Sequence, residues 1–301
     1  MKLDGYDLSD EYIIIMKYVS IPHSLNLSLS LAVWGICAFQ SVLSLSVAEA
    51  HELWLEAAEP MVSDDNQIGV DIRLGDMFAG SRQFFIPERS VMLKRITKDD
   101  EISLSPRPGN RPAISFPIPD QPSHTIIAYE TIGFYLTYKE WEKFIRFTED
   151  KGAADILDQH DIRNLPKVDF TERYKRYAKT SLFLSKAVEQ NNDAATGLEI
   201  EFVITNVTSA ASASQQITAV LIYQDMPLAD ALVTLFTRTP TGQVTTTTLK
   251  TDPEGLIRVE TQKGAYYMLD HVLFRPIAPD TDPNGAVWET LWASHSFSGP
   301  E

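Results

Sequence analysis

The sequence predicts a mainly β protein with two antiparallel β-sandwich regions, immunoglobulin-like or transthyretin-like, joined by a helical connector. Short runs of alternating apolar and polar residues, separated by prolines and glycines, follow residue 51 and return after Gly197. Between them lies a charge-rich stretch with apolar residues at helical spacing. We therefore expect an N-terminal sandwich at residues 51–136, a helical connector at 137–194 and a C-terminal immunoglobulin-like sandwich at 195–301.

The first 50 residues are predicted to be a signal peptide. An uncharged stretch centred on Leu31–Phe39 precedes an Ala-Glu-Ala cleavage site at 48–50. Residues 1–15 carry four acidic side chains against one lysine, which is unsuitable for a signal, so we expect translation to start at Met16. An uncleaved membrane anchor is the alternative, because the uncharged run is long enough to span a bilayer. Cleavage would make His51 the first residue of a periplasmic or secreted protein.

Cysteine content and charge limit the chemistry of the predicted mature chain. The only cysteine, Cys37, lies in the leader, so no disulfide or thiolate is expected. Removing residues 1–50 takes two of 26 basic and five of 41 acidic residues, which leaves 24 against 36 and a net charge of −12. Such a surface excludes nucleic acid as a partner and repels anionic lipid. Membrane contact is expected only through the leader before cleavage.

The expected elements follow in chain order. In the first sandwich, strands are predicted for the runs "IGVDIRL", "SVMLKRIT", "EISLSP" and "HTIIAYET". In the connector, Tyr138, Trp141 and Ile145 have helical spacing, and "FTERYKRYAKTSLFLS" is predicted to continue as helix. The strands of the second sandwich include a turn at Asp252–Gly255. A group of basic and aromatic connector residues is expected to clamp the two sandwiches: Arg173, Tyr174, Arg176, Tyr177 and Lys179.

The histidines are the candidate ligands for a metal. The sequence lacks dinucleotide-binding, Walker, nucleophile-elbow and zincin motifs, and we predict that the protein is not an enzyme. In a mature chain without cysteine, imidazole is the natural ligand for a late first-row divalent metal. The candidate ligands are His51, His124, His271 and His295. His160 lies in a charged run and is expected on the surface.

His51 has a special position among these candidates. As the first residue it would offer an α-amine and an imidazole, which chelate one metal through two nitrogens, and a further imidazole would complete a histidine brace. His124 begins a strand of the same predicted sandwich, whereas His271 and His295 belong to the second. Which of them reaches His51 stays open, as does the choice between nickel, cobalt and copper.

Several segments together resemble a known family: "HELWLEA", "PSHTIIAYET", "FTERYKRYAKTSL", "MPLADALVTLF", "TDPEGLIRV", "GAYYMLDHVLFRP" and "WETLWASHSF". They are similar to a secreted domain family of largely unknown function, described as the periplasmic component of cobalt/nickel ABC-type uptake systems. The resemblance spans nearly the whole predicted mature chain. It implies a protein that binds Ni²⁺ or Co²⁺ and passes it to a membrane ABC/ECF-type transporter. The family's histidines fall on His51 and His124, although Pro122 and Ser123 replace the usual glycine context.

Two other functions remain open beside metal supply. A copper-dependent oxidative enzyme would use the same histidine brace at a carbohydrate surface and would need an open metal position and an exposed aromatic face. Trp54, Trp288 and Trp292 could form such a platform, but we expect them to fill the core. A plain β-sandwich interaction module, with incidental histidines, is the third function.

Overall fold

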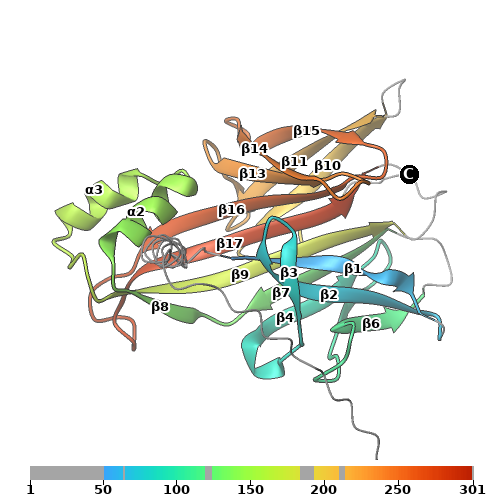
Figure 1. Cartoon of the computed structure of the whole chain (residues 1–301), viewed down its shortest axis with the longest axis horizontal. Helices are drawn as coiled ribbons and strands as arrows, with labels where there is room; N and C mark the ends of the chain where they lie inside the picture. The colour runs from blue at the N-terminus through green and yellow to red at the C-terminus, as the bar shows by residue number, and fades with distance from the viewer. Residues whose placement is uncertain (1–50, 64, 119–123, 184–192, 210–213, 300–301) are drawn as a thin grey trace, which may run out of the picture. The chain divides into compact units, whose positions relative to one another are not determined.

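The computed structural model of the chain describes residues 51–63, 65–118, 124–183, 193–209 and 214–299 (Figure 1). Ala48–Glu301 forms one unit, and the description that follows concerns this unit. The predictions for residues 1–50, including Cys37 and the cleavage site, lie outside the described residues. Within the described ranges, no helix has the length and apolar character needed to cross a membrane.

Strands from both halves of the chain form one large sheet, whose members are β4 (Ser90–Ile96), β5 (Glu101–Ser103), β7 (His124–Thr131), β8 (Phe134–Tyr138), β9 (Phe170–Phe183), β13 (Leu232–Arg238), β14 (Val244–Lys250), β16 (Tyr266–Pro276) and β17 (Ala286–Ser298). Its order is β14-β13-β16-β17-β9-β7-β4-β5, and β8 pairs with β9 beside β7. The long strands β16, β17 and β9 lie side by side at its centre (Figure 1). All pairs are antiparallel except β17 with β9, which is parallel.

Two smaller sheets and two helices complete the described fold. The N-terminal sheet contains β1 (Glu52–Val62), β2 (Gln67–Asp76), β3 (Ala79–Gln83) and β6 (Ile114–Pro117). The C-terminal sheet contains β10 (Ile200–Ser209), β11 (Ser214–Tyr223), β12 (Met226–Pro227) and β15 (Leu256–Gln262). The helices are α2 (Trp141–Asp150) and α3 (Asp155–Ile162), and a 3₁₀ turn spans Pro87–Arg89.

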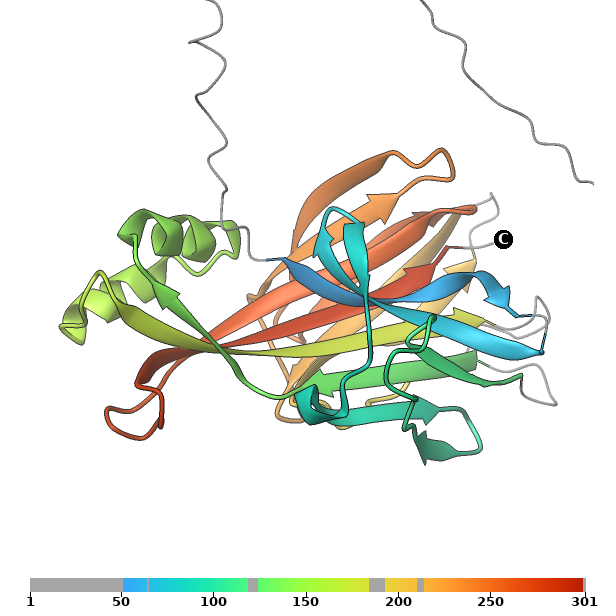
Figure 2. The ribbon, with the colours of Figure 1, turned by 60° about the horizontal axis from the view of Figure 1, so that its bottom comes forward.

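The large sheet is a middle layer that buries residues on both faces. Successive side chains of a strand point to opposite faces, so neighbours enter different cores. Tyr177 packs in the core with the C-terminal sheet, and Ala178 packs in the core with the N-terminal sheet. Ile126 and Ile127 on β7 divide in the same way. We call these two faces the C-terminal face and the N-terminal face (Figure 2).

The first strand is fixed to the N-terminal face by side chains of β17. Strand β1 pairs only with β2 within its sheet, so one of its backbone edges needs other partners. Ser294 Oγ donates a hydrogen bond to the Leu53 carbonyl at 2.7 Å, and Ser296 Oγ donates to the Leu55 carbonyl. These two bonds determine where the start of β1, and with it His51, lies on the large sheet.

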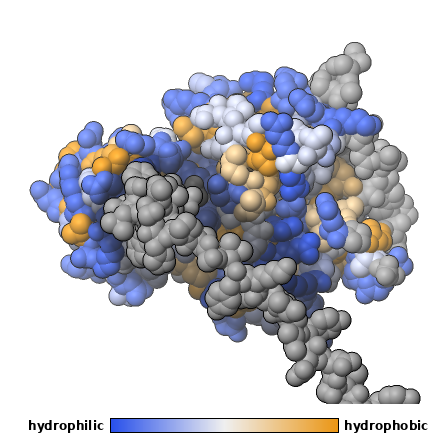
Figure 3. Space-filling view, in the orientation of Figure 1, coloured by the Kyte–Doolittle hydropathy of each residue, from blue (hydrophilic) through white to orange (hydrophobic). Residues whose placement is uncertain are grey.

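The helices cover the remainder of the N-terminal face through aromatic packing. Phe144 and Phe147 of α2 are buried against Trp288 and Trp292 of β17. Figures 1 and 2 show both helices at the end of the sheet where β9 and β17 begin. The visible surface is mainly hydrophilic with scattered hydrophobic patches (Figure 3), as expected for a chain with a net charge of −15.

The structure confirms the mainly β, sandwich-like fold class but changes the predicted organisation. The two predicted sandwiches share the large sheet. The predicted connector is helical only in α2 and α3, and its continuation over Phe170–Phe183 is wrong because those residues form β9. Both faces of β9 are covered, so polar residues such as Lys179 are buried there and do not mark the exposed side of a helix. Tyr174 and Tyr177 consequently lie on opposite faces.

The predicted surface position of His160 is also wrong. Its side chain is buried among the aromatic residues of the helical end. Trp288 Nε1 donates to His160 Nδ1 at 3.0 Å, which leaves Nε2 to donate to the Pro166 carbonyl at 3.1 Å. Burial lowers the pKa of His160, so it acts as a neutral structural imidazole. The charged neighbours that suggested a surface position lie on the outer side of α3.

Candidate functional site

Three of the four predicted metal ligands project from the C-terminal face of the large sheet. Each occurs two residues along its strand from a residue of the core shared with the C-terminal sheet. The strand alternation therefore places all three side chains on that face. The pairs of histidine and core residue are His124 with Ile126, His271 with Leu269, and His295 with Ala293.

His51 lies on the opposite face, immediately before β1. Its carbonyl accepts a hydrogen bond from Arg176 Nη2 at 3.0 Å. His124 pairs with Phe183, seven residues further along β9 than Arg176. At roughly 3.3 Å per residue, that separation is about 23 Å along the strand. The structure therefore does not bring His124 to His51.

The three histidines of the C-terminal face have interior environments. His295 is fully buried, its Nε2 lies 2.9 Å from Ser181 Oγ, and burial lowers its pKa to about 3. Burial also lowers the pKa of His271, whose Nδ1 lies 2.7 Å from the Leu232 carbonyl. All three are neutral near pH 7, because burial likewise lowers the pKa of His124.

The histidines do not form a ready metal centre. The positive charge of a protonated His124 contributes to the lowered pKa of His295, so these two histidines lie near each other. Both lie apart from His51. Among the described residues, no three His, Cys, Asp or Glu side chains are grouped so as to hold a metal ion. Of the five histidines in this part of the chain, His51 alone is exposed.

An acidic pair with one lysine lies directly beyond His51, and we call Glu52, Lys151 and Asp270 the Glu52 cluster. Lys151 Nζ lies 2.8 Å from Asp270 Oδ2 and 3.3 Å from Glu52 Oε1. Glu52 Oε2 is buried and has no hydrogen-bond partner within the described residues. Burial, followed by the charge of Asp270, raises the pKa of Glu52 to about 7. The cluster therefore retains part of a proton at neutral pH, and a cation could replace that proton.

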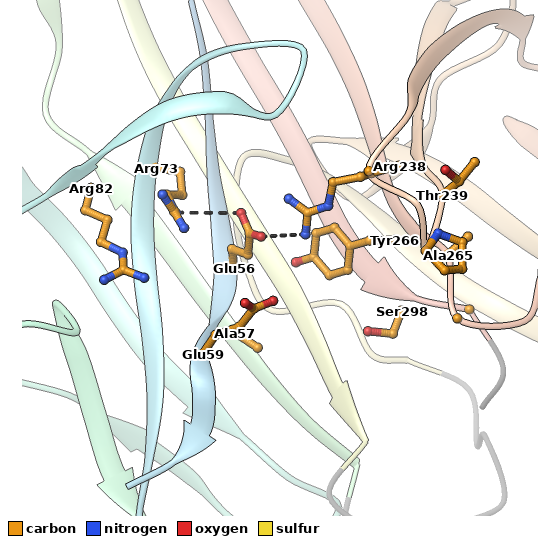
Figure 4. A pocket seen from close by; sticks show the side chains of 14 residues that line it. Glu56, Ala57, Glu59, Arg73, Arg82, Arg238, Thr239, Ala265, Tyr266 and Ser298 are labelled. Carbon is orange, nitrogen blue, oxygen red and sulfur yellow. Dashed lines mark hydrogen bonds and ion pairs between the residues drawn. The ribbon is translucent and has the colours of Figure 1, made fainter.

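A cleft of about 530 Å³ opens further along β1, between the N-terminal sheet and the β13 and β16 strands (Figure 4). At its side Glu56 lies between two guanidinium groups. Arg238 Nη2 is 2.6 Å from Glu56 Oε1, and Arg73 Nε is 3.7 Å from Glu56 Oε2. Trp54 Nε1 donates to the same carboxylate at 2.9 Å. Both guanidinium groups are therefore ion-paired with the same carboxylate at the side of the cleft.

A third charged group is buried between β9 and the C-terminal sheet, and we call Lys179, Asp193 and Glu201 the Lys179 cluster. Lys179 Nζ lies 2.8 Å from Asp193 Oδ2 and 3.1 Å from Glu201 Oε2. Each of the three side chains is at most 2% exposed. The local sequence pattern had predicted a helix at Lys179, whereas the residue lies on β9. A strand reading would have placed it between Tyr177 and Ser181 on a covered face, where a lysine needs buried acidic partners.

Most of the chain matches one known protein family. Residues 48–273 match the family described as "Domain of unknown function (DUF4198)". The chain belongs to this family. The match confirms the expected family of largely unknown function. No curated protein and no solved structure matches the chain. Membership of the DUF4198 family therefore shows relatedness to other proteins but does not establish an activity.

The tryptophans of this DUF4198 protein are core residues. Trp54 and Trp288 are completely buried, and Trp292 is 6% exposed. Trp54 packs against Phe78 in an edge-to-face arrangement. The three tryptophans that were considered for a carbohydrate platform therefore present no flat exposed surface.

Proposed function

We propose that this DUF4198 protein is exported, cleaved before His51, and binds one divalent transition metal through that residue. The observation that carries the proposal is the exposure of His51 while every other described histidine is partly or fully buried. The metal would be Ni²⁺ or Co²⁺, with Cu²⁺ as a strong competitor in vitro. The role is binding rather than catalysis, and the recipient is a membrane ABC/ECF-type uptake system.

The start of β1 supplies a rigid support for such a site. Arg176 holds the His51 carbonyl at 3.0 Å, and its guanidinium lies over the rings of Tyr174 at 4.9 Å and Trp292 at 5.8 Å. Holding the carbonyl leaves the α-amine and the imidazole of a cleaved chain to act as the two chelating nitrogens. Both groups bind metal only when deprotonated, so affinity is expected to fall as pH decreases.

Glu52 is better placed than His124 to provide the third ligand of the metal. Glu52 Oε2 is an unpartnered buried oxygen, and Glu52 directly follows His51. An amine, an imidazole and a carboxylate are all ligands of nickel and cobalt. Only the side chains of His51 and Glu52 are then required, because cleavage creates the α-amine as the third donor. Loading would displace the proton that Glu52 retains near neutral pH.

Calorimetry tests the proposal with the chain that starts at His51 and with Ni²⁺, Co²⁺ and Cu²⁺ as separate probes. One extra alanine before His51 separates the amine from its own imidazole, and we expect a loss of affinity of roughly 100-fold, as we do for His51→Ala. His124→Ala is the matched control and should keep wild-type affinity. Unchanged affinity in the extended chain would reject the chelate, and a large loss in the His124→Ala protein would reject the ligand assignment.

Export is tested separately by the intact mass of the protein recovered from the periplasm. We expect a mass within one water of the value calculated for residues 51–301. A mass that retains any part of 16–50 would leave no α-amine at His51 and would contradict the proposed chelate.

A further inference from the structure

The Lys179 cluster places a primary amine, a carboxyl group and a second carboxylate in direct contact inside the protein. Lys179 Nζ is 2.8 Å from Asp193 Oδ2, so it also lies close to the carboxyl carbon of Asp193. Glu201 Oε2 is 3.1 Å from the same nitrogen. Attack requires the nitrogen and the carboxyl carbon to approach to about 3–3.5 Å, and the ion pair brings the amine beside the carboxyl group that it would attack. No part of the proposed metal chemistry uses these groups.

We propose that Lys179 and Asp193 condense spontaneously to an intramolecular amide bond, with Glu201 as the proton carrier. The bond would join the middle of β9 to the segment that leads into β10. It would therefore fasten the large sheet covalently to the C-terminal sheet. In a mature chain without cysteine, it would provide the cross-link that a disulfide cannot.

The first step is a proton transfer from the Lys179 ammonium to the Asp193 carboxylate. The side chains of Lys179 and Asp193 are 1% and 0% exposed. The proton passes directly from Nζ to Oδ2, since the two atoms are in hydrogen-bond contact. The amine thereby gains the lone pair that it needs to attack.

The bond-forming step balances without an external reactant. The Lys179 nitrogen attacks the Asp193 carboxyl carbon, Glu201 accepts a proton from that nitrogen, and it returns the proton to the departing hydroxyl. A carbon–nitrogen bond forms, a carbon–oxygen bond breaks, and one water leaves. The net change is from an ammonium and a carboxylate to an amide and water. Because Glu201 contacts the reacting nitrogen, it is a catalytic residue for this condensation.

The backbone holds Glu201 in position for this role. Its Oε1 accepts hydrogen bonds from the Thr196 amide at 2.8 Å and the Gly197 amide at 3.1 Å. Its Oε2 accepts from Thr196 Oγ1 at 3.0 Å. The Asp193 carboxyl group is fixed in turn, because its Oδ1 accepts a hydrogen bond from the Ala194 amide at 2.7 Å. Both carboxyl groups are thus held before the reaction, which lowers the entropy cost of the attack.

Intact mass spectrometry of the purified full-length or exported protein tests the proposal. We expect a mass about 18 Da, one water, below the value calculated from the sequence. Trypsin should then yield a branched peptide that joins residues 177–186 to 187–238 and is not cleaved after Lys179. The calculated mass without any loss would overturn the proposal. A water loss confined to a linear 187–238 peptide, with normal cleavage after Lys179, would overturn it as well.

Two variants separate the condensation from an ordinary buried ion cluster. Glu201→Gln keeps the shape and an acceptor oxygen for the Thr196 and Gly197 amides but cannot carry the proton, so we expect a folded protein with no loss of water. Lys179→Arg keeps the charge but lacks a primary amine, and its mass should equal the calculated value. Water loss in Glu201→Gln would overturn the role of Glu201, and water loss in Lys179→Arg would place the dehydration elsewhere.

Discussion

The Glu52 cluster and the Lys179 cluster contain the same kinds of groups, two carboxyls and one lysine, in different surroundings. In the Lys179 cluster, backbone amides of Thr196 and Gly197 bind the Glu201 carboxylate, and all three charged side chains are at most 2% exposed. In the Glu52 cluster, the lysine is 12% exposed and Glu52 keeps one oxygen without a partner. Charge composition alone therefore does not determine what a buried cluster does.

The difference lies in how many hydrogen bonds reach the carboxylates. A buried carboxylate that lacks donors retains its proton to higher pH, and burial raises the pKa of Glu52 to about 7. Such a group can exchange its proton for a metal ion close to His51. The three side chains of the Lys179 cluster are almost fully excluded from solvent within the described part of the chain. Their geometry suits the internal reaction proposed above.

The largest expected effect comes from removing each lysine. Lys179→Met removes the proposed cross-link and leaves Asp193 and Glu201 buried together without a basic partner, and we expect a loss of about 3–5 kcal/mol in the free energy of unfolding. Lys151→Met should cost about 1–3 kcal/mol, because Glu52 can remain protonated and the site is closer to water. Urea denaturation at pH 7 measures both. Equal losses would show that the two clusters do not differ as the hydrogen bonds indicate.

A pH series tests the contrast between the two glutamates. The pKa of Glu52 lies at about 7 in the folded state against an ordinary value of 4.5, so its stabilising contribution is complete below 4.5 and is lost as pH rises through 7. Glu52→Gln should therefore match the wild type near pH 4 and be more stable at pH 8 by roughly 1–3 kcal/mol. Glu201→Gln should be less stable than the wild type at pH 8 by about 1–3 kcal/mol, because it loses charge-assisted hydrogen bonds. Urea midpoints measured between about pH 4 and pH 8 show whether each variant is more or less stable than the wild type. A Glu52→Gln protein destabilised at pH 8 would contradict the raised pKa.

The smallest effect concerns a single hydrogen bond at the edge of the Lys179 cluster. Thr196→Val removes the 3.0 Å bond from Oγ1 to Glu201 while preserving the size of the side chain, and should cost about 1 kcal/mol. Lys250→Ala is the control, because its pair with Asp230 is 66% and 85% exposed and should contribute less than about 0.5 kcal/mol. Thermal unfolding distinguishes the two. Identical melting temperatures for both variants and the wild type would mean that Thr196 does not support the cluster.

Strand prediction succeeded where one pattern dominated the local sequence. The runs around Val70 and Ile257 alternate, the run around Ile126 is rich in apolar residues, and all three form strands in the structure. The segment Phe170–Phe183 failed because both of its faces are covered and its buried positions include polar residues. Its partners β7, β8 and β17 come from distant parts of the chain, and no local signal shows that they meet there.

The candidate site, like the fold, could be predicted from the sequence only in part. The sequence identified His51 as the residue that follows the predicted cleavage site, and its exposure fits the proposed use. It also grouped His124 with His51, because both fall in the N-terminal half of the predicted mature chain. The parity of His124 on β7 places its side chain on the C-terminal face instead, near His295. One residue of register decides this, since successive side chains of a strand point to opposite faces.

By itself, the sequence determined the β-rich composition, the acidic net charge, the absence of cysteine after residue 50 and the inventory of five histidines in the described part of the chain. These properties depend on the residues present and on patterns a few residues long. Only the tertiary structure decided that β17 and β9 are parallel neighbours, that Lys179 meets Asp193 and Glu201, and that His51 lies on the face opposite to His124, His271 and His295. Such contacts depend on strand order and register over long sequence separations. They arise when the large sheet buries both of its faces, and no short stretch of sequence encodes them.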